Sequence, residues 1–243
     1  MRRKSILLGA ALLALLAGAV AVSLALLVRH VPAFYQSASL PPGPERQEQS
    51  KEFENKCSNL INGIINDRSW EERFTEAQIN SYFDEGFVRS GINDRLLPEG
   101  ISQPRISIKS DAMRLAFRYG TGSWCSAVVE IDFRIWLCAK ETNVVALELQ
   151  ALRAGSLPIT AQSLLERVSE AARRQDIEVT WYRHEGNPVA LLRFQANQPR
   201  PTVRLQRLEL KDGELVVGGT SVEAAPLRAM LGVPAGAWMP AAN

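Results

Sequence analysis

The strongest constraint on this chain is an apolar run that extends from Ile6 to Val28 without a charged residue. As a helix the run would be about 35 Å long, which is enough to cross a hydrocarbon core of about 30 Å. Three basic residues precede it at positions 2–4, whereas Arg29 alone carries a fixed positive charge directly after it. Since cytoplasmic flanks are richer in Lys and Arg, the sequence predicts a single-pass membrane protein with a cytoplasmic N-terminus and an extracytoplasmic main domain.

A cleaved signal peptide is the alternative interpretation of the same run. Residues 6–16 resemble an apolar signal core, and residues 17–21 offer small side chains at a cleavage position. Cleavage there would leave residues 22–28 as an exposed apolar N-terminus, so we favour the uncleaved anchor. Under both interpretations, the rest of the chain is exported from the cytoplasm.

Charge and composition place few other limits on function. The formal net charge is +2, and the basic residues at positions 2–4 already exceed it, so the exported part is close to neutral. No basic footprint indicates nucleic acid as a partner. The chain therefore divides into an anchor (residues 1–28), a Pro-rich tether (29–49), one domain (50–223) and a loosely ordered tail (224–243).

The expected tether contains prolines at positions 32, 41, 42 and 44, a composition that favours an extended, semi-rigid segment. Phe34 and Tyr35 follow the apolar run closely, where aromatic side chains commonly lie at the membrane interface. We therefore expect both at that interface, with a docking motif for a partner as the alternative.

Helical spacing predicts three helices in the domain. The first spans Ser50 to Ile65, with Cys57 as a small core residue on its apolar stripe. The second begins at Thr75, which can form a capping box with Gln78, and continues to about residue 87. The third spans about residues 161–174.

A period of two predicts the strands, which lie at residues 105–109, 113–119, 129–137, 143–153, 177–183, 189–194, 203–210 and 214–217. Pairing Ile135 with Val145 keeps the apolar sets of two neighbouring strands on one face. The predicted fold is α+β, a long curved antiparallel sheet of about six to eight strands packed against helices and preceded by one N-terminal transmembrane helix.

The sequence does not contain a residue pattern that predicts a catalytic site. His30 abuts the membrane run and His184 lies in a turn, so no base is placed for a Ser or Cys nucleophile. Cys57, Cys125 and Cys138 have no metal-ligand spacing, and we assign no disulfide to them. We expect no enzyme activity, no metal and no cofactor.

The strand pattern places one group of charged side chains on the same face of the sheet. Arg114 and Arg118 face the same side as Glu130, Asp132 and Arg134 on the next strand, and Arg114 is expected opposite Glu130. The cluster could be an acid and base pair or a site for an anionic ligand. A cross-strand charge ladder on a solvated sheet face is the interpretation that we favour.

The apolar side of the sheet offers a second candidate site. If the helices do not close over it, a groove for an acyl chain would remain; otherwise the same side chains make the core. The groove would be lined by Ile131, Phe133, Leu147, Leu149, Leu164 and Val168.

Three short motifs are similar to known bacterial proteins. Segments of bacterial single-span membrane proteins without an assigned activity resemble three stretches of this chain: Val31–Tyr35 after the apolar run, Phe74–Asn80 and Gly155–Ile159. The last two stretches also resemble, more distantly, the YpmS-like family. The resemblance implies an uncleaved anchor and a sheet-and-helix domain of the lipid-binding kind, and it carries no catalytic residues.

Together these observations predict a non-catalytic, membrane-anchored module that binds a protein or lipid of the cell envelope. The alternative is a carrier of a lipid or another hydrophobic ligand in a groove between sheet and helices. The partner itself is not indicated by any residue pattern.

Overall fold

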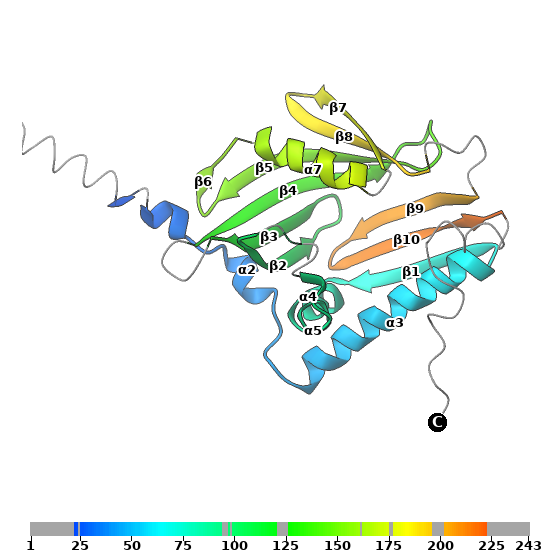
Figure 1. Cartoon of the computed structure of the whole chain (residues 1–243), viewed down its shortest axis with the longest axis horizontal. Helices are drawn as coiled ribbons and strands as arrows, with labels where there is room; N and C mark the ends of the chain where they lie inside the picture. Colours follow the sequence, from blue (N-terminus) through cyan, green and yellow to red (C-terminus); the bar gives the residue numbers. More distant parts are fainter. Residues whose placement is uncertain are drawn as a thin grey trace, which may run out of the picture.

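The fold is α+β, with two antiparallel sheets and few helices (Figure 1). The computed structural model describes residues 22–23, 25–93, 97, 99–120, 126–160, 162–174, 177–195 and 202–222. The predicted anchor therefore lies mostly outside the described residues, and the predicted tail lies wholly outside them. No helix in the described ranges has the length and apolar character that crossing a membrane requires.

The larger sheet has seven strands in the order β2-β3-β4-β5-β8-β7, with the short β6 paired to β5. Its strands are β2 (Ile101–Ile108), β3 (Met113–Tyr119), β4 (Ala127–Leu137), β5 (Val144–Ala154), β6 (Leu157–Pro158), β7 (Glu178–His184) and β8 (Asn187–Arg193). The antiparallel α+β class predicted from the alternating pattern is confirmed.

The larger sheet agrees with the expected six to eight antiparallel strands, but the last two predicted strands belong to a second sheet. β9 (Val203–Lys211) and β10 (Glu214–Ser221) form a three-stranded sheet with β1 (Ser69–Thr75) in the order β1-β10-β9. β1 was not predicted, since charged residues separate its two buried aromatic residues, Trp70 and Phe74. Trp70 donates its indole N–H to Ser221 Oγ at 3.1 Å, which ties β1 to the end of β10.

The N-terminal part of the domain is more helical than the proline content indicated. α2 spans Ala33–Ser37, and α3 runs from Pro44 to Asn66 along β1 (Figure 1). Proline is well tolerated in the first turn of a helix, where its missing N–H has no acceptor to lose. The expected extended tether is therefore corrected, because residues 33–37 and 44–49 are helical. Cys57 packs against the core beside Phe53 and Leu60, as predicted.

α4 (Glu76–Asp84) covers the β2 edge of the larger sheet. The predicted capping box is confirmed: Gln78 N–H donates to Thr75 Oγ1, and Gln78 Oε1 accepts from Thr75 N–H. Four residues of helix rise about 6 Å, close to the two-residue repeat of a strand. Glu76 Oε2 accordingly accepts from Ile108 N–H, while the buried Asn80 bonds both backbone groups of Ile106 at 2.8 and 2.9 Å. α4 thus occupies the backbone groups of an edge strand that could otherwise pair with another chain. The short α5 (Gly86–Arg89) follows it.

The pairing of β4 with β5 contains a β-bulge. After this bulge, the side chains of β5 lie on the opposite faces of the sheet from those that strict alternation predicts. Ile135 lies opposite Leu147, two residues from the predicted partner Val145, so the predicted faces are kept here. Between Asp132 and Phe133 the register shifts, and the exposed Gln150 is the extra residue of β5. Beyond this bulge the alternation changes phase, as bulges require. Residues 151 and 153 therefore face the polar side, whereas Leu152 is buried on the apolar side.

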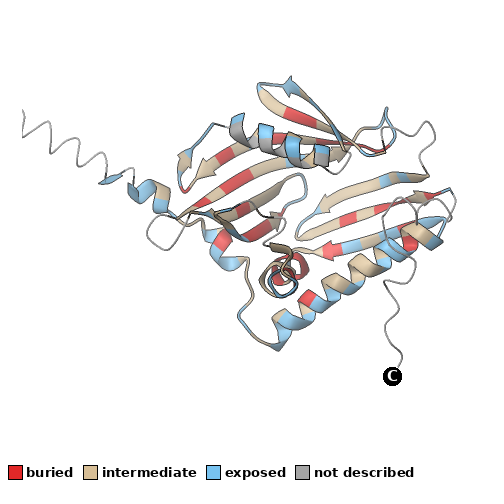
Figure 2. Cartoon of the chain, in the orientation of Figure 1, coloured by how far each residue is buried: buried red, intermediate tan, exposed pale blue. Residues whose placement is uncertain are grey.

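The two sheets share a core, and hydrogen bonds join them at the β4–β5 turn and again where Gly213 N–H donates to Ile108 C=O at 3.0 Å. Phe74, Ile79, Ile106 and Ile108 are buried together, with Leu210 and Leu215 of the smaller sheet packed against them. At the β4–β5 turn, Asn143 Nδ2 donates to Val203 C=O at 2.6 Å and Asn143 Oδ1 accepts from Leu205 N–H at 2.8 Å. Figure 2 shows the buried residues concentrated in the central strands and the inner side of the helices.

Candidate functional site

The two aromatic residues expected at the membrane interface lie on the polar face of the larger sheet. Tyr35, on α2, is only 7% exposed, packs against Ala116 and Val128, and donates its hydroxyl hydrogen to Gln103 C=O at 2.8 Å. Burial is the main cause that raises the pKa of the Tyr35 phenol. The expectation that Tyr35 faces the membrane is therefore corrected, because its ring belongs to the core of the domain.

Phe34 contacts one member of a cluster of four charged side chains. The Arg114 guanidinium carbon lies 4.8 Å from the centroid of the Phe34 ring, within range of a cation–π contact. Arg114 Nε lies 2.7 Å from Asp132 Oδ1 and 3.0 Å from Glu130 Oε1. Arg153 Nη1 lies 2.9 Å from Asp132 Oδ2 and 3.3 Å from Glu130 Oε1. We call Arg114, Glu130, Asp132 and Arg153 the charge cluster.

The charge cluster is only partly the ladder that the sequence predicts. Arg114 lies opposite Asp132, two residues from the expected partner, and it contacts Glu130 as well. Glu130 is 6% exposed, so the solvated-face expectation is wrong at this position. Burial raises its pKa, Arg114 opposes that rise and Asp132 adds to it. Arg153 was missed because the strict alternation of β5 assigns it to the apolar face, and only the bulge brings it to Glu130.

The same face of the sheet also binds the last residues of the apolar run, Leu27 and Val28. Ser156 N–H donates to Leu27 C=O at 2.9 Å, and Gly155 N–H donates to Val128 C=O at 2.7 Å. Gly155 has φ +58°, and a Cβ atom there would lie 2.3 Å from Leu27 O and 2.4 Å from Val28 O. Glycine is therefore the residue that lets the β5–β6 turn approach this backbone. We call residues 25–37 the N-terminal segment.

A second ionic group holds the loop that follows the N-terminal segment. Asp84, at the end of α4, pairs with the 7% exposed Arg105 of β2 and accepts a 2.6 Å hydrogen bond from Ser39 Oγ. Arg46 of α3 bonds Glu85 at 2.6 Å and lies 3.8 Å from Asp84. The loop between α2 and α3 is thus held against both α4 and the sheet.

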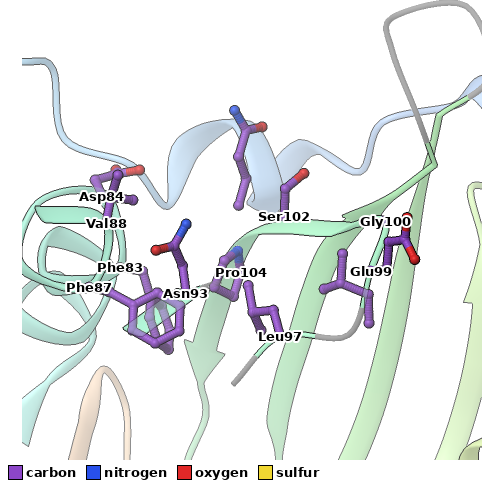
Figure 3. A pocket seen from close by; sticks show the side chains of 12 residues that line it. Phe83, Asp84, Phe87, Val88, Asn93, Leu97, Glu99, Gly100, Ser102 and Pro104 are labelled. Carbon is purple, nitrogen blue, oxygen red and sulfur yellow. The ribbon is translucent and has the colours of Figure 1, made fainter. Parts of the chain in front are cut away.

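Two cavities lie outside the charge cluster. The first, of about 520 Å³, lies between α4–α5 and the start of β2 (Figure 3). Its wall contains the rings of Phe83 and Phe87, whose centroids are 5.7 Å apart, together with polar groups of Asp84 and Ser102. The second, of about 620 Å³, lies along α7 (Gln162–Arg174) beside Trp181, whose indole N–H donates to Ser169 Oγ at 2.7 Å.

The predicted apolar groove is not where these cavities lie. Ile131 and Leu149 are buried with Leu152, and Leu165 of α7 packs against this cluster. Phe133 and Leu147 are half-buried. The side chains of Leu164 and Val168 lie outside the part of the chain that the structure describes. None of the four described groove residues lines either cavity.

Groups for metal binding or redox chemistry are not brought together in the described ranges. No set of three His, Cys, Asp or Glu side chains there could hold a metal ion. Cys57 and Cys138 are free thiols, and burial raises the pKa of both.

Comparison of the chain with protein-family models, with curated proteins and with solved structures finds no significant match. The resemblance to the YpmS-like family stays a prediction.

Proposed function

We propose that this chain is a single-span membrane protein whose extracytoplasmic α+β domain is a non-catalytic binding module of the cell envelope. The observation that carries the proposal is the hydrogen bond from Ser156 N–H to Leu27 C=O, because Leu27 lies at the end of the apolar run. With an inserted run, this bond and the packing of Tyr35 hold the domain next to the bilayer. A domain held in one place suits recognition of a neighbouring envelope component.

The packing of the apolar face supports a binding module over a carrier with its groove there. Ile131, Leu149 and Leu152 are buried, and Leu165 covers them. A ligand in that position would have to displace these contacts. Core packing of this kind stabilises a domain without leaving space for an acyl chain.

Carriage of a hydrophobic ligand is the second candidate function, and the cavity beside α5 favours it. Its volume of about 520 Å³ falls in the usual range of small-molecule pockets, and aromatic rings line part of it. The polar groups of Asp84 and Ser102 could orient a headgroup.

Two measurements on the full chain test the proposal. Carbonate extraction of native membranes, followed by external protease, should leave the N-terminal run in the bilayer and release the domain; release of the intact chain by carbonate would contradict an anchor. Native mass spectrometry of the detergent-purified chain should give the mass of the protein alone. A stoichiometric lipid adduct would favour the carrier.

A variant pair locates any such adduct. Val88 lines the cavity beside α5 and is 56% exposed, whereas Ile61 is 46% exposed on α3 and does not line it. Val88→Trp should abolish an adduct that occupies this cavity, and Ile61→Trp should leave it in place. Loss in both variants would place the lipid elsewhere.

A further inference from the structure

Exposed apolar side chains gather at one end of the larger sheet. Tyr119, the last residue of β3, is 53% exposed, and Ile159, just after β6, is 43% exposed. Strand pairing relates their positions: Tyr119 lies opposite Ala127, and Ala154 lies opposite both Val129 and Leu157. Ile159 N–H donates to Leu152 C=O, two residues inside the end of β5. We call residues 119–120, 126–127 and 155–160 the uncharged rim, since none of them is Asp, Glu, Lys, Arg or His. The exposed Glu99 borders this rim, where Ile101 of β2 pairs with Tyr119.

The rim is also the place where the N-terminal segment joins the domain. Leu27 C=O accepts from Ser156 N–H within the rim, and Leu26 and Leu27 are themselves 66% and 41% exposed. Figure 1 shows the chain leaving the domain toward the N-terminus at the end of the sheet where β6 lies. A bilayer that contains the apolar run must therefore begin close to this rim.

We propose that the uncharged rim rests in the interfacial layer of a phospholipid bilayer, with Tyr119 and Ile159 as its contact residues. The proposal rests on the membrane anchor of the proposed function and adds the orientation of the domain. Tyrosine suits the interface because its ring is apolar and its hydroxyl is polar. Chain continuity favours lipid over a protein partner at this surface, since the apolar run leads directly from Leu27 into the membrane.

The chain offers a matched control for each contact residue. Tyr182 is 41% exposed, but it lies on β7, two strands away from β5 and level with Glu148, six residues from Ala154. Ile61 is 46% exposed on α3. These residues repeat the chemistry of Tyr119 and Ile159 away from the rim.

The experiment places one fluorophore at each position in turn. Cys57, Cys125 and Cys138 are replaced by Ala in the full chain, and Tyr119→Cys, Ile159→Cys, Tyr182→Cys and Ile61→Cys are labelled with bimane. The labelled chains are reconstituted into phosphatidylcholine vesicles with and without a lipid that carries a doxyl quencher near the headgroup. Probes at positions 119 and 159 should lose most of their fluorescence with the quencher, whereas probes at 182 and 61 should keep it. All four positions are exposed, so substitution there disturbs little packing.

Carbonate extraction of the same vesicles separates the two proposals. Resistant protein with unquenched probes at 119 and 159 would overturn the orientation while the anchor stands. Extracted protein with unquenched probes would overturn both. Quenching at all four positions would also overturn the orientation, because the bilayer would then touch the domain without preference for the rim.

Discussion

Ser156 donates its backbone N–H to the carbonyl oxygen of Leu27 across 2.9 Å, and this bond joins the end of the apolar run to the β5–β6 turn. Tyr35 and Phe34 continue the attachment over the polar face of the sheet. The domain is therefore packed against the N-terminal segment, and the extended tether expected over residues 29–49 is replaced at residues 33–37 by a helix that packs on the sheet.

Substitution of Gly155 tests this attachment. In Gly155→Ala the new Cβ would lie 2.3 Å from Leu27 O, so the N-terminal segment must move away. We expect faster trypsin cleavage after the exposed Arg29, together with a loss of about 1–2 kcal/mol in the free energy of unfolding from the left-handed backbone. Limited proteolysis of the full chain measures the first effect.

Gly186→Ala is the control for backbone strain alone. Gly186 has φ +89°, and no atom lies within 4 Å of a Cβ placed there. The free energy of unfolding of the Gly186→Ala variant should fall by about as much as that of Gly155→Ala, but the rate of trypsin cleavage after Arg29 should not change. Equal proteolysis of the two variants would contradict docking at Gly155.

The raised pKa of Glu130 predicts a pH dependence of stability. Burial favours the protonated carboxyl in the folded state, so the folded chain binds this proton more tightly than the unfolded chain. The free energy of unfolding should therefore decrease as the pH rises from near the usual value of 4.5 through the raised pKa. In Glu130→Gln, this part of the decrease should disappear in urea titrations over that range.

Glu209 provides the matched control because its pKa is shifted the other way. The hydrogen bond from Arg207 is the largest cause that lowers the Glu209 pKa, so its titration falls below the range in which Glu130 acts. In Glu209→Gln, the free energy of unfolding should keep its wild-type pH dependence over the range in which Glu130 titrates. A profile of Glu130→Gln that matches the wild type would show that burial does not shift Glu130.

The parts of the fold that depend on neighbouring residues were predictable from sequence. Thr75 and Gln78 form the expected capping box because a cap involves only four consecutive residues. Cys57 lies on the expected apolar stripe because helical spacing alone selects it. The apolar face of β4 was likewise correct, since Val129, Ile131 and Phe133 belong to one apolar cluster.

The parts that depend on distant partners were not predictable. β1 forms because β10 pairs with it more than a hundred residues later along the chain, and its own pattern is interrupted by charge. Arg153 joins the charge cluster only because a bulge at Gln150 reverses the phase of β5. Phe34 and Tyr35 were assigned to the membrane interface because sequence position shows nearness to the span, whereas burial depends on the sheet face that they meet.

Asn80 should be essential for the edge of the larger sheet. In Asn80→Ala, both backbone groups of Ile106 lose their partner in a buried site. Each buried unsatisfied group costs about 1–3 kcal/mol, so unfolding in urea should begin at a lower concentration. The uncovered edge strand should also increase aggregation, which light scattering would record.

Ser81→Ala is the adjacent control. Ser81 is 1% exposed, and its hydroxyl has no hydrogen-bond partner among the described residues. Removal of this hydroxyl should change the stability little or increase it slightly. A loss in Ser81→Ala as large as in Asn80→Ala would show that α4 tolerates no substitution here, and the role of Asn80 would be refuted.

The central claim is that the domain is attached to the end of its own apolar run, and hydrogen exchange at the Ser156 amide tests it most directly. In the full chain reconstituted in a bilayer, a hydrogen bond to Leu27 predicts exchange that is much slower than that of an unstructured peptide. Exchange of Ser156 N–H at the unprotected rate, with slow exchange kept in the central strands, would contradict the claim.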